Sequence, residues 1–276
     1  MRKVKFLLML ACVFVLAISS VSFAHFQTIY TPESALVKGG EIDLKLVFTH
    51  PFEAGHTMDI GKDEKGEIHS PVAFGVMHKG RKKDLLNTLK PITWTSLTNS
   101  GKAYEASYRL KGMGDFVFYF HPAPYYESSE DAYIQQITKL IVNVAGAPTD
   151  WNEEVGLPVE IAPLDKPYAL WTGNVFRGIV KCNGEPVPYC EIEVEYMNHH
   201  PQIKTNKFAK QAEVEAPQDA FVTLTIMADS NGVFTFGIPR AGWWGFAALG
   251  AGGDLKHNGK ELSLDAVIWV QARDMK

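Results

Sequence analysis

The chain has 276 residues, of which 46% are hydrophobic and 21% are charged, and its formal net charge is −4. This length suits one or two globular domains, and the acidic balance argues against a protein that binds nucleic acid through a basic surface. Removal of the first 24 residues would take away three positive charges and no negative one, so the remainder would carry −7.

Residues 1–24 have the parts of a secretory signal peptide. Three cationic residues precede an almost wholly apolar run, and Ser22 and Ala24 put small side chains at the positions that a signal peptidase reads. The apolar run is shorter than a typical membrane span of about 20 residues, and we find no later stretch that would span a bilayer. We therefore predict cleavage after Ala24 and an exported mature chain that begins at His25 and does not insert into the membrane.

Short alternating or apolar segments fill residues 25–160 and are separated by Gly, Pro and Asn. In chain order they are FQTIYTP, EIDLKLVFTH, SPVAFGVMH, PITWTSL, AYEASYRL, DFVFYFHP and TKLIVNVAG. Such short strands with this punctuation are typical of an antiparallel β-sandwich, and no segment keeps a helical spacing of apolar residues for three turns. We predict an all-β chain whose first domain, residues 25–160, is an immunoglobulin-like sandwich.

A second set of strand-like segments follows the proline-marked stretch GLPVEIAPLDKP. Its pattern, GIVKCNGEPVPYCEIEVEY followed by ADSNGVFTFGIPRAGWWGFAA, is similar to the transthyretin-like sandwiches of secreted proteins. We predict a second antiparallel sandwich over residues 161–276. Alternation along its GWWG segment predicts that one of Trp243 and Trp244 lies in the core and the other outside it.

Cys182 and Cys190 flank the turn-like sequence NGEP and are the cysteines that remain after the predicted cleavage. In an oxidising compartment this pair predicts a disulfide across a hairpin. A pair of free thiols and a thiolate metal site are the alternatives, although two cysteines at this spacing match no zinc motif.

The histidines can be sorted by the direction of the strands that carry them. If consecutive strands alternate in direction, the start of the first, the end of the second and the end of the sixth share one end of the sandwich. These places hold His25, His50 and His121, and His56 lies in the loop just after His50. The same parity sends His78 to the opposite end.

A mature N-terminal His25 would offer a metal ion both its imidazole and its α-amine. The amine loses its proton at little cost near neutral pH, because its free pKa is about 7.7 to 8.0. With His50, His56 and His121 this nitrogen-rich set favours nickel, copper, zinc or cobalt over magnesium and calcium. We predict a metal site formed by His25, His50, His56 and His121.

The remaining histidines are not among the predicted ligands. His69 precedes the third strand at the end that holds the predicted ligands. His199 and His200 stand in a polar, basic segment, and His257 stands in a glycine-rich turn, so all three are expected in solvent.

The acidic segment ESSEDAY is expected at the same end as the metal site. Glu127, Glu130 and Asp131 would raise the local concentration of cations there through a screened field. We do not expect them in the first coordination shell.

Several longer motifs resemble a known family: FTHPFEAGHTMDIG, FGVMHKGRKKDLL, GDFVFYFHPAPYYESSEDAYI, TKLIVNV and PYALWTGNVFRGIV. They are similar to bacterial periplasmic proteins described as a component of nickel and cobalt uptake, which contain a domain formerly of unknown function. The resemblance runs over nearly all of the mature chain. It implies a periplasmic metal-binding protein that serves a membrane importer, with Ni²⁺ as the first choice and Co²⁺ as the second. Cu²⁺ and Zn²⁺ remain alternatives.

The resemblance extends to individual residues of the predicted site. It covers His25 and His50 of THPFE, and it continues to His56 and Met58 of GHTM. At the position of His121, before PAPY, members of the family can carry an acidic residue, so an imidazole is not required there.

Two further classes of function are compatible with the same sequence. In a non-catalytic adhesion or carbohydrate-binding sandwich, the histidines would be incidental. An N-terminal histidine beside another imidazole also resembles the copper brace of oxidative polysaccharide-cleaving enzymes, which would need a flat aromatic substrate face. Nucleophile motifs and phosphate-binding glycine loops are absent from the sequence, and we predict that the protein is not an enzyme.

Overall fold

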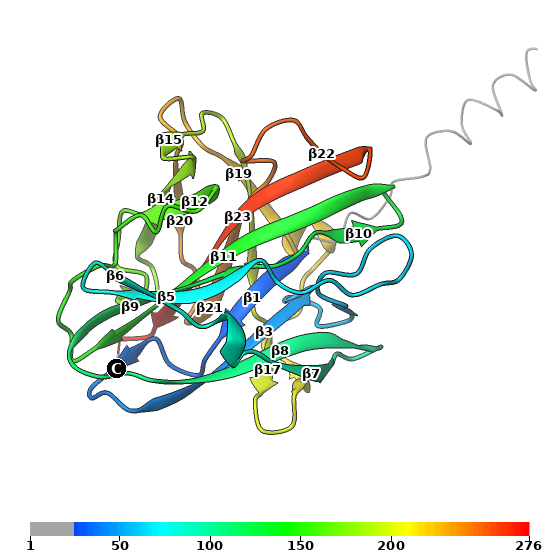
Figure 1. Cartoon of the computed structure of the whole chain (residues 1–276). Coiled ribbons are helices and arrows are strands. Elements are labelled where there is room, and N and C mark those ends of the chain that lie inside the picture. The colour runs from blue at the N-terminus through cyan, green and yellow to red at the C-terminus, as the bar shows by residue number, and fades with distance from the viewer. Residues whose placement is uncertain (1–24, 276) are drawn as a thin grey trace, which may run out of the picture.

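The computed structural model describes residues 25–275, so the predicted signal peptide lies outside the described residues. The described chain consists of β-strands with two short 3₁₀ helices, η1 (Leu86–Thr88) and η2 (Asp219–Phe221). The predicted all-β sandwich class is confirmed (Figure 1). Within residues 25–275, no helix is long and apolar enough to cross a membrane.

The strands form three sheets. In the seven-stranded sheet the order is β1 (Phe26–Tyr30), β3 (Glu41–Thr49), β8 (Ser100–Arg109), β7 (Lys90–Thr95), β18 (Lys207–Ala212) and β17 (His199–Gln202), with β4 (Thr57–Met58) beside β3. The four-stranded sheet has the order β12 (Val159–Pro163), β14 (Val175–Cys182) and β15 (Glu185–Pro186), with β20 (Val233–Gly237) beside β14.

The third sheet has twelve strands and is central. Its order is β19 (Leu224–Met227), β16 (Glu191–Tyr196), β21 (Gly242–Ala248), β23 (Lys260–Arg273), β11 (Ala132–Val144), β9 (Gly114–His121), β5 (Ala73–His78) and β6 (Arg81–Asp84). Four short strands extend it: β10 (Tyr125–Glu127) and β2 (Ala35–Leu36) pair with β11, and β13 (Leu170–Trp171) and β22 (Leu255–His257) pair with β23.

The two longest strands, β11 and β23, join the early and late parts of the chain. They pair in parallel from Tyr133↔Leu262 to Leu140↔Trp269, and Figure 1 shows them side by side through the middle of the molecule. Strands from both sides of the predicted boundary at residue 160 therefore belong to one sheet. The division into 25–160 and 161–276 stays a prediction.

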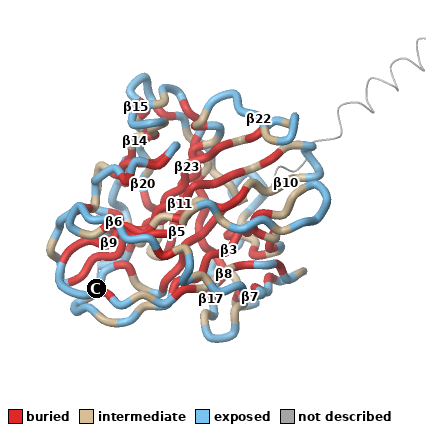
Figure 2. The backbone as a smooth tube through the Cα atoms, viewed as in Figure 1, coloured by how far each residue is buried: buried red, intermediate tan, exposed pale blue. Residues whose placement is uncertain are grey.

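Each face of the central sheet covers a hydrophobic core, and Figure 2 shows the buried backbone along β11 and β23. Ile137 and Ile141 of β11 pack into the core shared with the four-stranded sheet. Leu140 and Val142 of the same strand pack into the core shared with the seven-stranded sheet. Because both faces are buried, Leu140, Ile141 and Val142 form a continuous apolar run rather than an alternating pattern.

The two adjacent tryptophans show the same arrangement. Trp243 and Trp244 are only 6% and 5% exposed. Trp243 belongs to the core beside the seven-stranded sheet, and Trp244 belongs to the core beside the four-stranded sheet. The expectation that one ring lies outside a core was wrong. Successive side chains of this strand point to opposite faces of the central sheet, and each face is covered by a core.

Cys182 and Cys190 are free thiols in this structure, so the predicted disulfide is not formed. Cys182 ends β14 of the four-stranded sheet and faces Glu185 across the hairpin. Cys190 lies directly before β16 of the central sheet, and its Sγ is 3.3 Å from the carbonyl oxygen of Leu249. The two cysteines therefore lie beside different sheets. Burial also raises the pKa of the Cys190 thiol to about 12, which argues against a thiolate metal ligand.

We expect the mature protein, unfolded without reductant, to take up two alkyl groups, as measured by intact mass. In the native protein the half-buried Cys182 should react before Cys190, because the thiolate is the reactive form and burial suppresses it at Cys190. Peptide mapping of a labelling time course would show the order. A native, unreduced sample that takes up no label after unfolding would contradict the free-thiol state.

A buried ion pair joins β11 to β12. The Nζ of Lys139 lies 2.7 Å from Oε2 of Glu160, and the two side chains are 1% and 2% exposed. Glu160 also accepts the backbone N–H groups of Val155, Gly156 and Leu157. The carboxylate is thus fully partnered, and it fixes the segment before β12 against the central sheet.

The substitution Lys139→Met should lower the free energy of unfolding by about 3 to 5 kcal/mol, because it leaves the buried Glu160 without its counter-charge. Urea denaturation would measure this loss. Arg177→Met, which removes the exposed ion pair with Asp165, is the control and should have a much smaller effect. Similar losses of unfolding free energy in the two variants would show that the buried ion pair contributes no more to stability than the exposed one.

Candidate metal centre

Three of the four predicted ligands stand at the ends of three adjacent strands. β1 begins directly after His25, β3 ends directly before His50, and these strands pair antiparallel up to those ends. β4 begins directly after His56 and pairs antiparallel with the same end of β3. The strand register therefore makes His25, His50 and His56 cross-strand neighbours, which we call the histidine row.

The rings of the histidine row lie close together. The ring centroids of His25 and His50 are 4.8 Å apart with the planes at 79°, and those of His50 and His56 are 6.4 Å apart. His25 and His50 are half-buried, whereas His56 is exposed. The Nε2 atom of His56 lies 3.2 Å from the side-chain nitrogen of Asn99. The row thus leads from the protein interior to solvent.

A carboxylate from the central sheet meets the inner end of the row. Oε2 of Glu127, at the end of β10, lies 3.1 Å from Nε2 of His25. Its Oε1 accepts hydrogen bonds from the backbone N–H and the hydroxyl of Ser129. The hydrogen bond with His25, followed by those with Ser129, lowers the pKa of Glu127 to about 2. Glu127 is therefore ionised and touches His25, closer than the long-range role expected for the acidic segment.

The middle histidine is held in its neutral form. Burial lowers the pKa of His50 to about 3, and the nearby His25 and His56 lower it further, while Glu127 acts in the opposite direction. A neutral imidazole keeps a nitrogen lone pair, which is what a metal ion requires of a histidine ligand.

His121 stands apart from the histidine row. It ends β9 in the central sheet, where its cross-strand partner is Ala73 of β5. The ring contacts found within residues 25–275 join the three histidines of the row but do not extend to His121. Burial lowers the pKa of His121, and the Gln135 side chain opposes this shift. The structure thus groups three of the four predicted ligands.

The histidines outside the predicted site give mixed results. His78 stacks on Phe116 with ring centroids 3.9 Å apart, at the end of β5 away from the pair Ala73↔His121, so the parity argument placed it correctly. His199 is buried and its Nδ1 lies 2.9 Å from the carbonyl oxygen of Ala209, so its interpretation as a solvated residue was wrong.

A second group of potential ligands lies in the loop before β5. Single ligand atoms of Asp63, Glu67 and His69 lie within 4.8 Å of one another. Nε2 of His69 is 2.8 Å from Asp63 Oδ2, and Asp63 Oδ1 accepts the N–H groups of Lys65 and Glu67. Sequence reasoning missed this group, although two acidic residues and a histidine around Gly66 in DEKGEIH were a signal. The turn hydrogen bonds by themselves account for its geometry.

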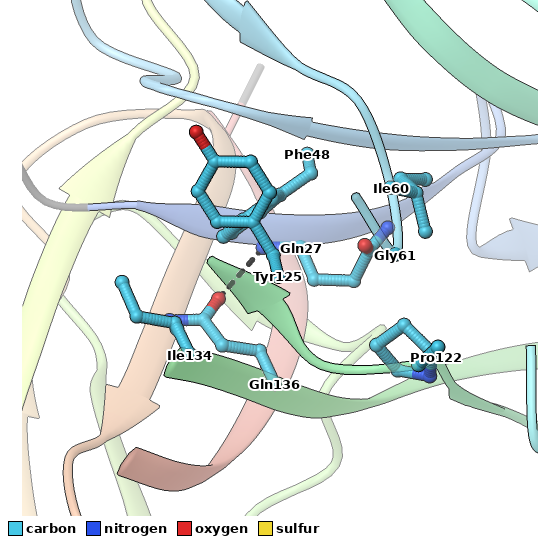
Figure 3. Close-up of a pocket in the computed structure, with 9 residues that line it drawn as sticks. Gln27, Phe48, Ile60, Gly61, Pro122, Tyr125, Ile134 and Gln136 are labelled. Atoms are coloured by element: carbon cyan, nitrogen blue, oxygen red, sulfur yellow. Dashed lines mark hydrogen bonds between the residues drawn. The ribbon is translucent and has the colours of Figure 1, made fainter. Parts of the chain in front are cut away.

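Side chains of the central sheet hold the strand that carries His25. The Gln136 amide donates to the carbonyl oxygen of His25 at 2.7 Å. It also accepts the N–H of Gln27 at 2.7 Å (Figure 3). The Thr138 hydroxyl and the Trp269 indole N–H donate to the carbonyl oxygen of Gln27, at 3.1 and 3.0 Å. β1 is the edge strand of its sheet, so these side chains take the place of a neighbouring strand.

A small cavity lies beside this contact. It is lined by Gln27, Phe48, Ile60, Gly61, Pro122, Ala123, Tyr125, Ile134 and Gln136 (Figure 3). The cavity has room for about one water molecule. It is far too small for an organic ligand. This cavity is therefore not a site for a small organic molecule.

The family of the protein follows from a match over residues 22–252. These residues match the family described as a domain of unknown function, DUF4198. The chain belongs to this family. No curated protein matches this DUF4198 chain.

Several solved structures resemble the DUF4198 chain weakly. The Yersinia pseudotuberculosis adhesin InvE is 14% identical, with 88% of this chain and 58% of the adhesin covered and a TM-score of 0.23. The D0-D1 domain of Intimin is 10% identical, with 90% and 100% covered and a TM-score of 0.21. Escherichia coli alpha-2-macroglobulin activated by porcine elastase is 9% identical, with 90% and 20% covered and a TM-score of 0.24.

A buried carboxyl group supports the turn that follows His50. Glu195 of β16 accepts the backbone N–H of Phe52 at 3.1 Å and the hydroxyl of Thr223. Its side chain has almost no contact with solvent, and burial raises its pKa to about 8. At neutral pH the group is therefore mostly an uncharged carboxylic acid.

We expect Glu195→Gln to raise the unfolding temperature at pH 8.5 and to leave it nearly unchanged at pH 4.5. The pKa of Glu195 is raised from 4.5 to about 8 on folding, so its contribution to stability is complete below about pH 4.5 and declines as the pH rises toward 8. Gln stays neutral throughout and removes this decline. Thermal unfolding of the wild type and the variant, followed by circular dichroism at both pH values, would test this prediction. An equal difference in unfolding temperature at pH 4.5 and pH 8.5 would show that Glu195 does not titrate in this range.

Proposed function

We propose that this protein binds a divalent transition-metal ion in the periplasm, with Ni²⁺ as the first candidate and Co²⁺ as the second, for delivery to a membrane importer. The observation that carries the proposal is the histidine row of His25, His50 and His56 with the Glu127 carboxylate against His25. The resemblance of the sequence to nickel and cobalt uptake proteins supports the choice of cargo.

The chemistry of the donor set fits this cargo. Neutral imidazole nitrogens suit nickel, cobalt, copper and zinc, whereas magnesium and calcium prefer oxygen ligands. Glu127 holds the Nε2 side of the His25 ring through their contact, and it favours the tautomer that carries a proton there. Nδ1 of His25 is then the nitrogen with a free lone pair. Carboxylates commonly orient metal-binding histidines in this way.

The N-terminal amine would complete a chelate on the same residue. Cleavage after Ala24 would free the α-amine of His25, and the amine and Nδ1 can close one ring on a metal ion. The hydrogen bond from Gln136 to the carbonyl oxygen of His25 fixes the backbone of this residue. The chelating residue is thus held at its ring by Glu127 and at its backbone by Gln136.

The test is calorimetric titration of the mature protein, beginning at His25, with Ni²⁺, Co²⁺, Cu²⁺ and Zn²⁺. We expect His25→Ala and His50→Ala to weaken Ni²⁺ binding at least tenfold, which corresponds to about 1.4 kcal/mol. A chain extended to Met-His25 keeps the ring but moves the amine, and it should also bind at least tenfold more weakly. Glu127→Ala should weaken binding by about 10-fold to 100-fold, as for other groups that orient a ligand.

Matched variants separate this site from other binding modes. His200→Ala, in an exposed position, should leave the affinity unchanged. Loss of binding in His69→Ala, with none in His25→Ala or His50→Ala, would move the metal to the Asp63, Glu67 and His69 group and overturn the proposal. His121→Ala would show whether the fourth predicted ligand takes part.

The alternative functions predict different results in the same titrations. An adhesion or carbohydrate-binding sandwich would show no metal affinity that depends on the histidine row. A copper-brace enzyme would prefer Cu²⁺ and would cleave a polysaccharide oxidatively when supplied with peroxide. Either outcome would replace the proposed role in metal uptake.

A further inference from the structure

The end of the molecule opposite the histidine row carries a group of cations, which we call the basic end. It comprises Lys38, Lys79, Arg81, Lys82, Lys83 and Lys111, all of them exposed. None of the six takes part in an ion pair with another residue of the described chain. Some cations elsewhere, such as Lys45, Arg240 and Lys260, are paired with acidic side chains.

Three separate segments meet at the basic end. The N–H of Leu110, before the β8–β9 loop, donates to the carbonyl oxygen of Gly40 in the β2–β3 loop at 2.8 Å. Gly114, where β9 begins, lies close to His78, which directly precedes the β5–β6 turn. A Cβ atom added to Gly114 would be 3.2 Å from the His78 ring. Figure 1 shows β5, β6 and β9 together at the end of the molecule away from β10.

Two apolar side chains project from the same end. Val37 and Met113 are 92% and 60% exposed, and they stand in the two loops that also carry Lys38 and Lys111. Each is an apolar residue beside a cation at a loop tip. Neither contributes to a core of the described chain.

Two acidic groups at the basic end accept hydrogen bonds from the backbone. Asp150 is 5% exposed and accepts the N–H groups of Lys79 and Gly80. Asp84, on β6, accepts the N–H of Leu86. Lys79 and Gly80 both have positive φ, 52° and 68°, which suits a tight hairpin turn. The hairpin is therefore held in shape by Asp150, while its cations form no ion pair within the described chain.

We propose that the basic end docks on the surface of a membrane rich in anionic phospholipid. Clustered lysines and arginines are attracted to anionic headgroups, at about 1 kcal/mol for each cation, and exposed apolar side chains beside them can enter the interfacial region. Because the mature chain is otherwise acidic, its electric field turns this end toward the lipid. The histidine row then faces the aqueous side. This inference does not depend on the proposed metal-binding function.

Lipid fits this surface better than an acidic protein does. An acidic protein could pair with the cations. Binding to such a partner would not explain why two apolar side chains, Val37 and Met113, are exposed in the loops beside the cationic hairpin. A bilayer surface accepts both kinds of group at once, because headgroup charge and acyl chains lie within one side-chain length of each other.

The experiment is co-sedimentation of the mature protein with vesicles. We expect binding to vesicles that mix phosphatidylglycerol with phosphatidylcholine, weak or no binding to pure phosphatidylcholine, and a decline with added salt. The triple variant R81Q, K82Q, K83Q should lower the partition coefficient at least tenfold. The double variant V37S, M113S should weaken the part of the binding that survives at high salt.

A matched control removes the same number of charges elsewhere. Lys204, Lys207 and Lys210 are exposed lysines on and before β18, and the triple variant K204Q, K207Q, K210Q should bind vesicles like the wild type. Thermal unfolding would show that each variant is folded. The proposal is overturned by absence of binding to the anionic vesicles, by equal losses in the two triple variants, or by binding to polyglutamate but not to lipid, which would indicate an acidic protein partner.

Discussion

The hydrogen bonds of one amide side chain connect the two sheets that build the candidate metal centre. Gln136 of β11 accepts the N–H of Gln27 and donates to the carbonyl oxygen of His25 and to the carboxylate of Asp265. Asp265 is buried and also accepts the N–H of Gly250. A buried polar network stabilises a fold only when its members are satisfied, and these groups all have partners. The position of His25 is therefore fixed by the interior of the protein and not by the loops around it.

Sequence reasoning could place two ligands because it needed only the direction of strands. In an antiparallel pair the residue before one strand faces the residue after its partner, so His25 and His50 follow from β1 and β3. His56 was placed only by its nearness to His50 in the sequence, and β4, which brings it beside the end of β3, was not predicted. Parity also sends His121 to the same end, but parity does not say which sheet a strand joins. β9 belongs to the central sheet and its residues alternate between the two faces, so His121 projects to the face opposite to that of Phe120, which packs in the core beside the seven-stranded sheet.

The features that sequence reasoning missed depend on contacts between distant segments. The run TKLIVNV predicted part of β11, but β23 was not among the predicted segments, and nothing local indicated that the two strands pair. The prediction of a disulfide was wrong for a related reason. Cys182 and Cys190 are close in sequence, yet the chain passes from the four-stranded sheet to the central sheet between them. Glu127 was expected to act only through its long-range field, but β10 places its carboxylate against the His25 ring.

The pairing of β11 with β23 has a consequence for the order in which the molecule is made. During synthesis β11 emerges long before β23, so one edge of β11 stays without its partner until residues 260–273 are available. Non-local pairing of this kind is slow, and an unpaired strand edge is a template for aggregation. Because β23 contributes side chains to two cores, neither can close on a nascent chain. A chain that lacks residues 260–273 should therefore leave both cores open.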